Sequence, residues 1–206
     1  MDGASNASSG AASEEDRAFA AISGHRALDL LATLRDRHRD PRECLREPAD
    51  LDRWLLAVGL PIGVRATEAD LEDARRFRET VNRLTRAILA GQAPDADDLR
   101  KLNASAGRPA LAPQAEADLQ RRWIAEDPVQ AALALIAREA AELLTGAERD
   151  LIRECAAAPR CSRLYLDRSR ARRRRWCHMD WCGSRAKMSS YRQRHGAAAH
   201  TASGNA

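Results

Sequence analysis

The stretch that decides the C-terminal part of this chain runs from Cys155 to Lys187 and reads CAAAPRCSRLYLDRSRARRRRWCHMDWCGSRAK. It holds four of the five cysteines in the 206-residue chain, arranged as two close pairs. Four thiolates form a closed tetrahedral shell of soft ligands, which is typical of a structural zinc site. The spacing therefore predicts that Cys155, Cys161, Cys177 and Cys182 hold one structural Zn2+.

The folding energy of this stretch also favours a metal. A short segment with so many arginines buries too little apolar surface to fold alone, whereas a structural zinc contributes roughly 10 to 16 kcal/mol to the folding of a small domain. Ordinary buried thiols or a redox pair remain alternatives, and His178 is an alternative ligand beside Cys177. Cys44 stands apart and is expected to be an incidental thiol.

The charge of the chain is divided between its two ends. Between Arg160 and His195 there are twelve basic and two acidic residues, a formal charge of +10, and the remainder of the chain carries −6. The net charge of +4 therefore conceals an acidic body with a basic end. Such an asymmetry indicates a polyanionic partner.

The basic segment offers two groups of candidate nucleic-acid contacts. Four adjacent arginines repel one another, and a phosphate backbone offsets that repulsion. After Cys182 a helix is predicted. Met188 and Tyr191 on it are expected to pack on the metal-binding segment, while cations flank a face of small and amide side chains, as a major-groove helix requires. A solvated charged hairpin and helix are the alternative. The candidate contacts are Arg172, Arg173, Arg174, Arg175, Arg185, Lys187, Arg192, Gln193 and Arg194.

The segment between the two cysteine pairs must leave the metal and return to it. We expect residues 162–176 to do so as a hairpin. Since side chains alternate along a strand, Leu164 and Leu166 then share one face and Tyr165 occupies the other.

The rest of the chain reads as a succession of helices. Thr67 and Asp70 form a capping box, Asp127 and Pro128 start another helix, and Gly59 suits a left-handed C-terminal cap. The apolar spacing predicts helices within residues 25–38, 47–60, 67–91, 95–102 and 128–146, and a strand or hairpin arm over 119–124.

Composition points to the same fold class. Aromatic residues are only 4% of the chain, so the core must consist mainly of small aliphatic side chains, which favours packed helices. The predicted fold is mainly α with small β elements (α+β), a helical N-terminal domain followed by a small four-cysteine zinc finger with a β-hairpin and a helix. Residues 1–22 and 196–206 are expected to be disordered tails.

No apolar run reaches the roughly 18 to 20 residues of a membrane span, and the N-terminus lacks the pattern of a secretory signal. We therefore expect a cytoplasmic protein with no membrane partner.

The finger segment resembles the CGNR zinc finger family. That family combines a cysteine pair, an apolar-aromatic-apolar-Asp segment, Arg-Arg-Trp-Cys and Cys-Gly-Asn-Arg. Ser184 stands where the family has Asn, and the first cysteine pair is one residue wider. The matching positions are Leu164, Tyr165, Leu166, Asp167, Ser169, Arg174, Arg175, Trp176, Cys177, Met179, Cys182, Gly183, Arg185, Ala186 and Lys187.

In that family the finger usually follows a helical domain called ABATE, to which the preceding residues are similar. The similar positions are Asp29, Thr33, Leu51, Trp54, Gly59, Leu60, Arg78 and Glu79. The resemblance implies an ABATE-like domain over residues 23–146, a CGNR-type finger over 147–195, and a bacterial, stress-related transcription regulator.

These patterns favour a zinc-dependent regulator that binds double-stranded DNA through its basic finger. The acidic N-terminal domain would then sense a small-molecule effector or form a homodimer. An RNA-binding zinc module and a protein-interaction adaptor are the alternatives, RNA ranking second because the finger has few aromatic side chains for stacking.

An enzyme is not expected, because the chain lacks a nucleophile and base pair, a Gly-rich phosphate loop and an open metal site. Asp29, Arg78, Glu79 and Asn103 are expected to be surface or ion-paired residues rather than the lining of a pocket.

Overall fold

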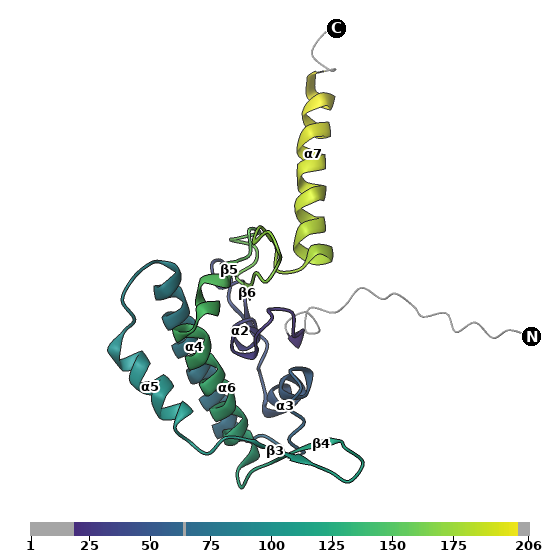
Figure 1. Ribbon diagram of the computed structural model, residues 1–206. Coiled ribbons are helices and arrows are strands. Elements are labelled where there is room, and N and C mark those ends of the chain that lie inside the picture. The colour runs from purple at the N-terminus through teal and green to yellow at the C-terminus, as the bar shows by residue number, and fades with distance from the viewer. Residues whose placement is uncertain (1–18, 64, 202–206) are drawn as a thin grey trace, which may run out of the picture.

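The computed structural model describes residues 19–63 and 65–201; for Gln193 and residues 195–201 it describes the backbone. Within these ranges helices predominate, and the strands form small antiparallel pairs, which confirms the predicted α+β class (Figure 1). The helices are α2 (Arg26–Leu31), α3 (Pro48–Ala57), α4 (Glu68–Leu89), α5 (Ala96–Ala106), α6 (Pro128–Thr145), η1 (Ala147–Leu151), η2 (Met179–Gly183) and α7 (Ser184–Thr201). The strands are β1 (Leu34–Arg35), β2 (Arg42–Glu43), β3 (Ala112–Ala115), β4 (Arg121–Ile124), β5 (Ile152–Glu154) and β6 (Leu164–Leu166).

Three helices form the main body of the N-terminal part. α4 and α6 lie side by side, and α5 packs against both (Figure 1). At the start of α4 the Thr67 hydroxyl accepts a hydrogen bond from the Asp70 amide, and the Asp70 carboxylate accepts one from the Thr67 amide. At the start of α6 Asp127 accepts from the Gln130 amide, and Pro128 occupies the first turn. Both predicted helix starts are confirmed.

The short helices α2 and α3 complete the apolar core against α4 and α6. Leu28, Leu30 and Trp54 are fully buried there. Gly59 ends α3 with a φ of +80°, the left-handed conformation predicted for it, which a side chain would disfavour.

Helix α2 ends earlier than the sequence predicted. Leu34 was expected on the next helical turn but lies in β1, opposite Glu43 of β2. Thr33 marks the change, because its hydroxyl donates to the Leu30 carbonyl at 2.7 Å and its own carbonyl accepts the Cys44 amide at 2.9 Å. After Thr33 the backbone therefore forms the hydrogen bonds of the β1–β2 hairpin instead of those of a helix.

A second hairpin precedes α6. Residues 121–124 form β4, which pairs antiparallel with β3, so the expected hairpin arm is confirmed. Leu119 takes a φ of +61° in the connecting turn.

The third hairpin joins the finger to the helical body. β5 and β6 pair antiparallel, and Ile152, Leu164 and Leu166 are buried in the same core as the helices. Tyr165 points the other way, into a second cluster with the cysteines. The predicted alternation of the two faces is confirmed, and the finger is packed on the body through one of them.

The last helix, α7, projects away from the rest of the molecule (Figure 1). It packs mainly on η2, the single π-helical turn before it. α7 continues to Thr201 and so extends into the segment 196–206, which was expected to be a tail. Residues 1–18, most of the other expected tail, and residues 202–206 lie outside the described part of the chain. Within the described residues, no helix combines the length with the apolar character that a membrane span requires.

Candidate metal centre

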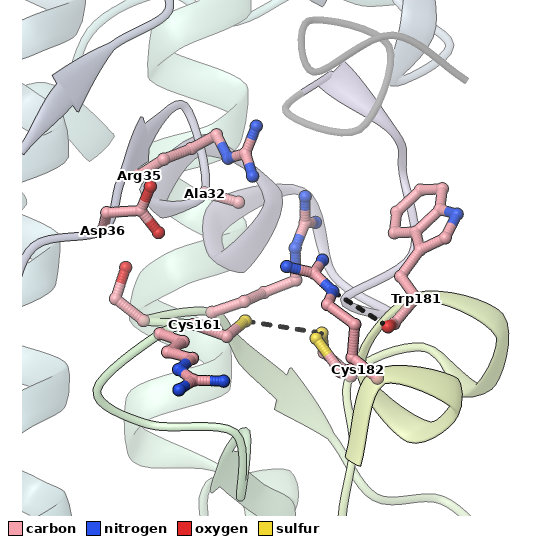
Figure 2. Close-up of a pocket in the computed structure, with 11 residues that line it drawn as sticks. Ala32, Arg35, Asp36, Cys161, Trp181 and Cys182 are labelled. Atoms are coloured by element: carbon pink, nitrogen blue, oxygen red, sulfur yellow. Dashed lines mark hydrogen bonds between the residues drawn. The ribbon is translucent and has the colours of Figure 1, made fainter. Parts of the chain in front are cut away.

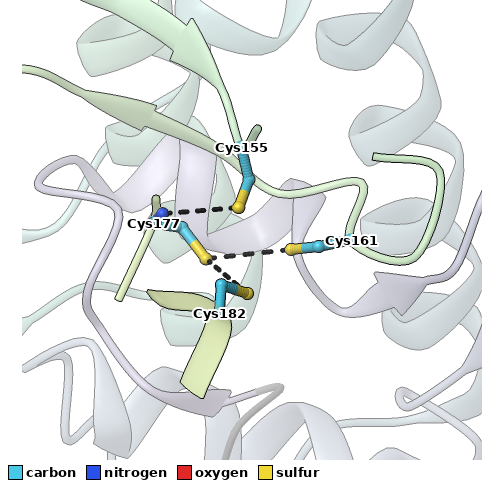
Figure 3. A group of neighbouring side chains, drawn as sticks. All are labelled: Cys155, Cys161, Cys177 and Cys182. Carbon is cyan, nitrogen blue, oxygen red and sulfur yellow. Dashed lines mark hydrogen bonds between the residues drawn. The ribbon is translucent and has the colours of Figure 1, made fainter. Parts of the chain in front are cut away.

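The four cysteines of the finger meet at one point (Figure 3). Cys155 directly follows β5, Cys161 precedes β6, and Cys182 lies in η2, two residues before α7. Cys177 follows the arginine-rich turn. Cys161 is half-buried and the other three are buried.

Their sulfur atoms have the spacing of a tetrahedral ligand set. All four Sγ atoms lie within 4.8 Å of one another, and Cys177 Sγ is 3.7 Å from Cys161 Sγ and 3.6 Å from Cys182 Sγ. Thiolates around Zn2+, with Zn–S bonds of about 2.3 Å, stand roughly 3.8 Å apart, whereas a disulfide requires about 2.05 Å. The donor set fits one structural Zn2+. The alternative ligand His178 lies outside the cluster, its ring stacked on Trp181.

Four thiols held this closely compete for their protons. Hydrogen bonds from the other three thiols, Cys161 first, lower the pKa of Cys155. For Cys177 the hydrogen bonds with the other three, Cys155 first, raise the pKa instead. One thiolate therefore forms at the expense of another unless a bound cation stabilises all four in their deprotonated form. The Cys177 amide also donates to Cys155 Sγ at 3.5 Å, a contact that stabilises a thiolate ligand.

Tyr165 packs in the cysteine cluster, and Arg174 lies over its ring. The buried Tyr165 hydroxyl donates to the Arg174 carbonyl at 2.5 Å, and burial raises the pKa of Tyr165 to about 12. The Arg174 guanidinium lies 4.6 Å from the centre of the tyrosine ring and donates to the carbonyls of Trp176, at 2.8 Å, and of Cys177. Arg174, predicted to contact phosphate, thus has partners inside the finger and positions the backbone of a metal ligand.

Asp167 shapes the turn that returns the chain to Cys177. Its carboxylate is fully buried and accepts hydrogen bonds from the Ser169 hydroxyl at 2.6 Å, the Ser169 amide at 3.0 Å and the Arg174 amide at 2.9 Å. These bonds, those from Ser169 first, lower the pKa of Asp167. The carboxylate therefore closes the turn in its ionised form.

We expect Asp167→Asn to destabilise the chain at pH 7 by about 1.5 to 3 kcal/mol, the usual contribution of hydrogen bonds to a charged group. Because the folded pKa lies below the value of about 3.9 for an unfolded Asp, this contribution is complete above about pH 4 and is lost as the pH falls through the folded pKa. Urea unfolding of both proteins at several pH values measures the difference. The exposed Asp180→Asn is the matched control, and an equal, pH-independent effect of both changes would contradict the prediction.

The hairpin expected over residues 162–176 is wrong in its pairing. β6 pairs with β5, which precedes Cys155, and in the described chain the returning segment forms no strand. That segment is held instead by the Asp167 and Arg174 contacts and by a hydrogen bond from the Ala156 amide to the Arg175 carbonyl at 2.8 Å. The hairpin therefore encloses the first cysteine pair rather than separating the two pairs.

The helix after Cys182 is present, but its expected packing is wrong. Met188 and Tyr191 are each 55% exposed, so their stripe does not pack on the finger. Lys187, Arg192 and Arg194 are exposed as well, and the side chain of Gln193 lies outside the described part. The first two turns of α7 thus adjoin the finger, where Ala186 and Ser189 are half-buried, while most of its other described side chains are exposed.

The other predicted contacts lie in the turn and at the foot of α7. Arg172, with a φ of +48°, Arg173 and Arg175 are exposed. The Arg175 guanidinium lies 5.0 Å from the centre of the Trp176 ring. Arg185 is exposed, and its Nε donates to the Trp181 carbonyl at 3.2 Å.

One pair of residues that ties the finger to the helical body was not predicted. Arg163 is buried, and its guanidinium donates to Asp29 Oδ1 at 3.4 Å and to Ser23 Oγ at 3.2 Å. Burial raises the pKa of Asp29, although hydrogen bonds from Ser23 and the charge of Arg163 oppose that change. The residues are far apart in sequence, and only the unusual Asp in the apolar stretch LDLL signals the contact.

Comparison with known families agrees with this architecture. The ABATE family model, described as "Putative stress-induced transcription regulator", matches residues 24–147. The CGNR zinc finger model matches residues 152–195. A search of curated proteins gave no significant match. The chain belongs to the ABATE family and carries a CGNR zinc finger with one structural Zn2+ site formed by its four clustered cysteines.

Proposed function

We propose that this protein is a zinc-dependent transcription regulator, cytoplasmic and nucleoid-associated, whose C-terminal finger binds double-stranded DNA. The observation that carries the proposal is the position of α7, which leaves the metal cluster and projects clear of the body (Figure 1). Among the described residues, Lys187, Arg192 and Arg194 on this helix make no ion pair with an acidic side chain.

The dimensions of α7 suit a DNA groove. Its 18 residues correspond to a rod of about 27 Å, and the major groove, about 12 Å wide, admits one α-helix. A helix of this length is marginal in water without a packing partner. The exposure of Lys187, Arg192 and Arg194 on it therefore favours a role in binding.

In this proposal different residues of the finger contact the phosphates and the base edges of the DNA. When bound, Zn2+ would offset two of the four thiolate charges and fix the two cysteine pairs relative to each other. Arg172, Arg173 and Arg175 contact phosphates from the turn, and the cations of α7 contact phosphates on either side of the groove. Gln193 and the serines of α7 reach base edges.

The proposal gives the N-terminal domain the role of sensing a small-molecule effector or of forming a homodimer. A cavity of about 610 Å3 between α4, α5 and α6 supports the first role, because small-molecule sites commonly have volumes of about 300 to 1,000 Å3. Leu84, Leu102 and Leu144 supply an apolar lining, and Asn103, which was expected to lie outside any pocket, adds a polar group.

The test is the salt dependence of DNA binding by the purified zinc-loaded protein. About five phosphate contacts by the finger give a slope of log affinity against log salt of about −4.5 or steeper, so affinity falls roughly 500-fold or more between 50 and 200 mM salt. A titration in a fluorescence anisotropy assay with random duplex DNA measures the slope. Flat salt dependence, or no binding at 50 mM salt, would overturn DNA binding.

The same assay separates the alternatives. Single-stranded RNA that competes better than duplex DNA would favour an RNA-binding module, and failure to bind either nucleic acid would favour a protein-interaction module.

A further inference from the structure

A polar groove of about 700 Å3 lies where the N-terminal domain meets the finger, at the foot of α7. One side is the β1–β2 hairpin, and the other consists of finger residues next to metal ligands. Arg160 precedes Cys161, and Arg185 lies on the first turn of α7 after Cys182. The groove adjoins the smaller cavity of Figure 2, where Arg35 and Asp36 face Cys161, Trp181 and Cys182.

The groove is strongly cationic. Asp36 is already bound by Arg42, whose Nε lies 3.0 Å from Asp36 Oδ2. Asp40 is the other acidic residue of the lining, and in the described chain Arg39 and Arg160 form no ion pair. The lining contains five arginines and two aspartates, namely Arg35, Arg39, Arg42, Arg160, Arg185, Asp36 and Asp40. Like charges gathered in one concave surface attract an anion.

Both sides of the groove are fixed in place. Asp36, at a φ of +51°, turns the chain so that the Arg39 amide bonds to the Asp36 carbonyl at 2.9 Å. The Arg37 amide donates to Ser162 Oγ at 3.3 Å, which ties this turn to the finger. Arg160 lies in the tight turn of the first cysteine pair, where its amide donates to the Ala157 carbonyl at 2.9 Å. The groove is therefore preorganised by the same contacts that dock the finger.

We propose that this groove binds the phosphodiester backbone of the DNA that α7 contacts, and that Arg39 and Arg160 each contact a phosphate. The inference rests on the proposed function and extends the DNA-binding surface from the finger to the ABATE domain. Arg185 belongs both to α7 and to the groove, so a strand beside the first turn of α7 passes directly over Arg160 and the β1–β2 turn. An open, polar groove suits a backbone better than an enclosed apolar ligand.

The test compares Arg39→Ala and Arg160→Ala with Arg65→Ala in the same DNA titration. Arg65 is exposed and precedes α4, and the opposite end of that helix carries the Arg86–Glu154 contact with the finger. Arg65 is therefore remote from the groove, and Arg65→Ala changes the net charge by the same amount as the groove variants. With the two groove contacts added, the wild-type slope of log affinity against log salt is about −6.3. Each groove variant makes that slope shallower by about 0.9. At 0.1 M salt each groove variant then binds roughly 8-fold more weakly, and Arg65→Ala binds like the wild type.

Each other outcome overturns the inference in a distinguishable way. A wild type with a steep slope and groove variants that match Arg65→Ala would remove the groove from the interface while leaving the proposed function intact. A wild type that does not bind DNA would remove both. If inorganic phosphate or a nucleoside monophosphate saturates the wild type in calorimetry, and the groove variants lose that binding but keep full DNA affinity, the groove holds a free anion instead. Zinc content and circular dichroism confirm that each variant is folded.

Discussion

Removal of the zinc is expected to unfold the metal-binding part of the finger while the helical body stays folded. The second cluster contains the four cysteines, Tyr165 and Trp176, and offers little apolar surface apart from them. A structural zinc contributes roughly 10 to 16 kcal/mol in small finger domains. The β5–β6 hairpin should persist, because Ile152, Leu164 and Leu166 belong to the helical core.

Hydrogen exchange read by mass spectrometry, before and after chelation, measures this difference along the chain. Protection should disappear over residues 155–163 and 176–192 and remain over α4 and α6. DNA binding should be lost together with α7, because that helix is joined to the body through η2.

The matched variants are Cys177→Ala and Cys44→Ala, since both thiols are buried and only Cys177 is in the cluster. Cys177→Ala should lose the metal, whereas Cys44→Ala should retain one zinc per chain. Full zinc content and unchanged exchange in Cys177→Ala would refute the metal centre.

Arg78→Ala should destabilise the N-terminal domain by about 3 kcal/mol, within the range for breaking a buried ion pair. Arg78 is only 3% exposed and donates to both carboxylate oxygens of Glu43, at 2.7 and 2.6 Å, and to Glu79 at 2.8 Å. Burial opposes the charge of Glu79, but hydrogen bonds from Arg37 and Arg78 outweigh it and lower the pKa of Glu79. Without Arg78 both glutamates lose their shared counter-charge.

Urea unfolding at pH 7 measures this effect, and the same helix supplies the control. Arg76 has a side chain that is 66% exposed and pairs with Glu72 and Asp73, so Arg76→Ala should destabilise the domain far less than Arg78→Ala, because water screens exposed ion pairs. Equal losses for the two variants would show that burial does not strengthen the Arg78 network.

Local chemistry explains why the sequence predicted some elements correctly. Thr67 with Asp70 and Asp127 with Pro128 specify helix starts through contacts within one turn, and these starts are confirmed. The four cysteines were identifiable because a zinc site depends on residue type and short spacing. Arg78 and Glu79 were expected to be surface or ion-paired residues, and they are ion-paired.

Contacts between distant segments explain the errors. Helical periodicity places Met188 and Tyr191 on one face but does not reveal whether another element covers that face. The spacing of the cysteines requires the chain to return, but the partner of β6 precedes the first cysteine. The Arg163–Asp29 contact joins residues that neither motif connects.

The docking of β6 on the helices also bears on how this protein can be divided. The two family models meet between residues 147 and 152, a place where an expression fragment would naturally be cut. A fragment that begins there would present Ile152, Leu164 and Leu166 to water and leave Arg163 without Asp29. The helical fragment would lose the strands that cover one end of its core. The boundary between the two families therefore runs through one apolar core, which the helical body shares with the β5–β6 hairpin, whereas the four cysteines lie in a separate cluster.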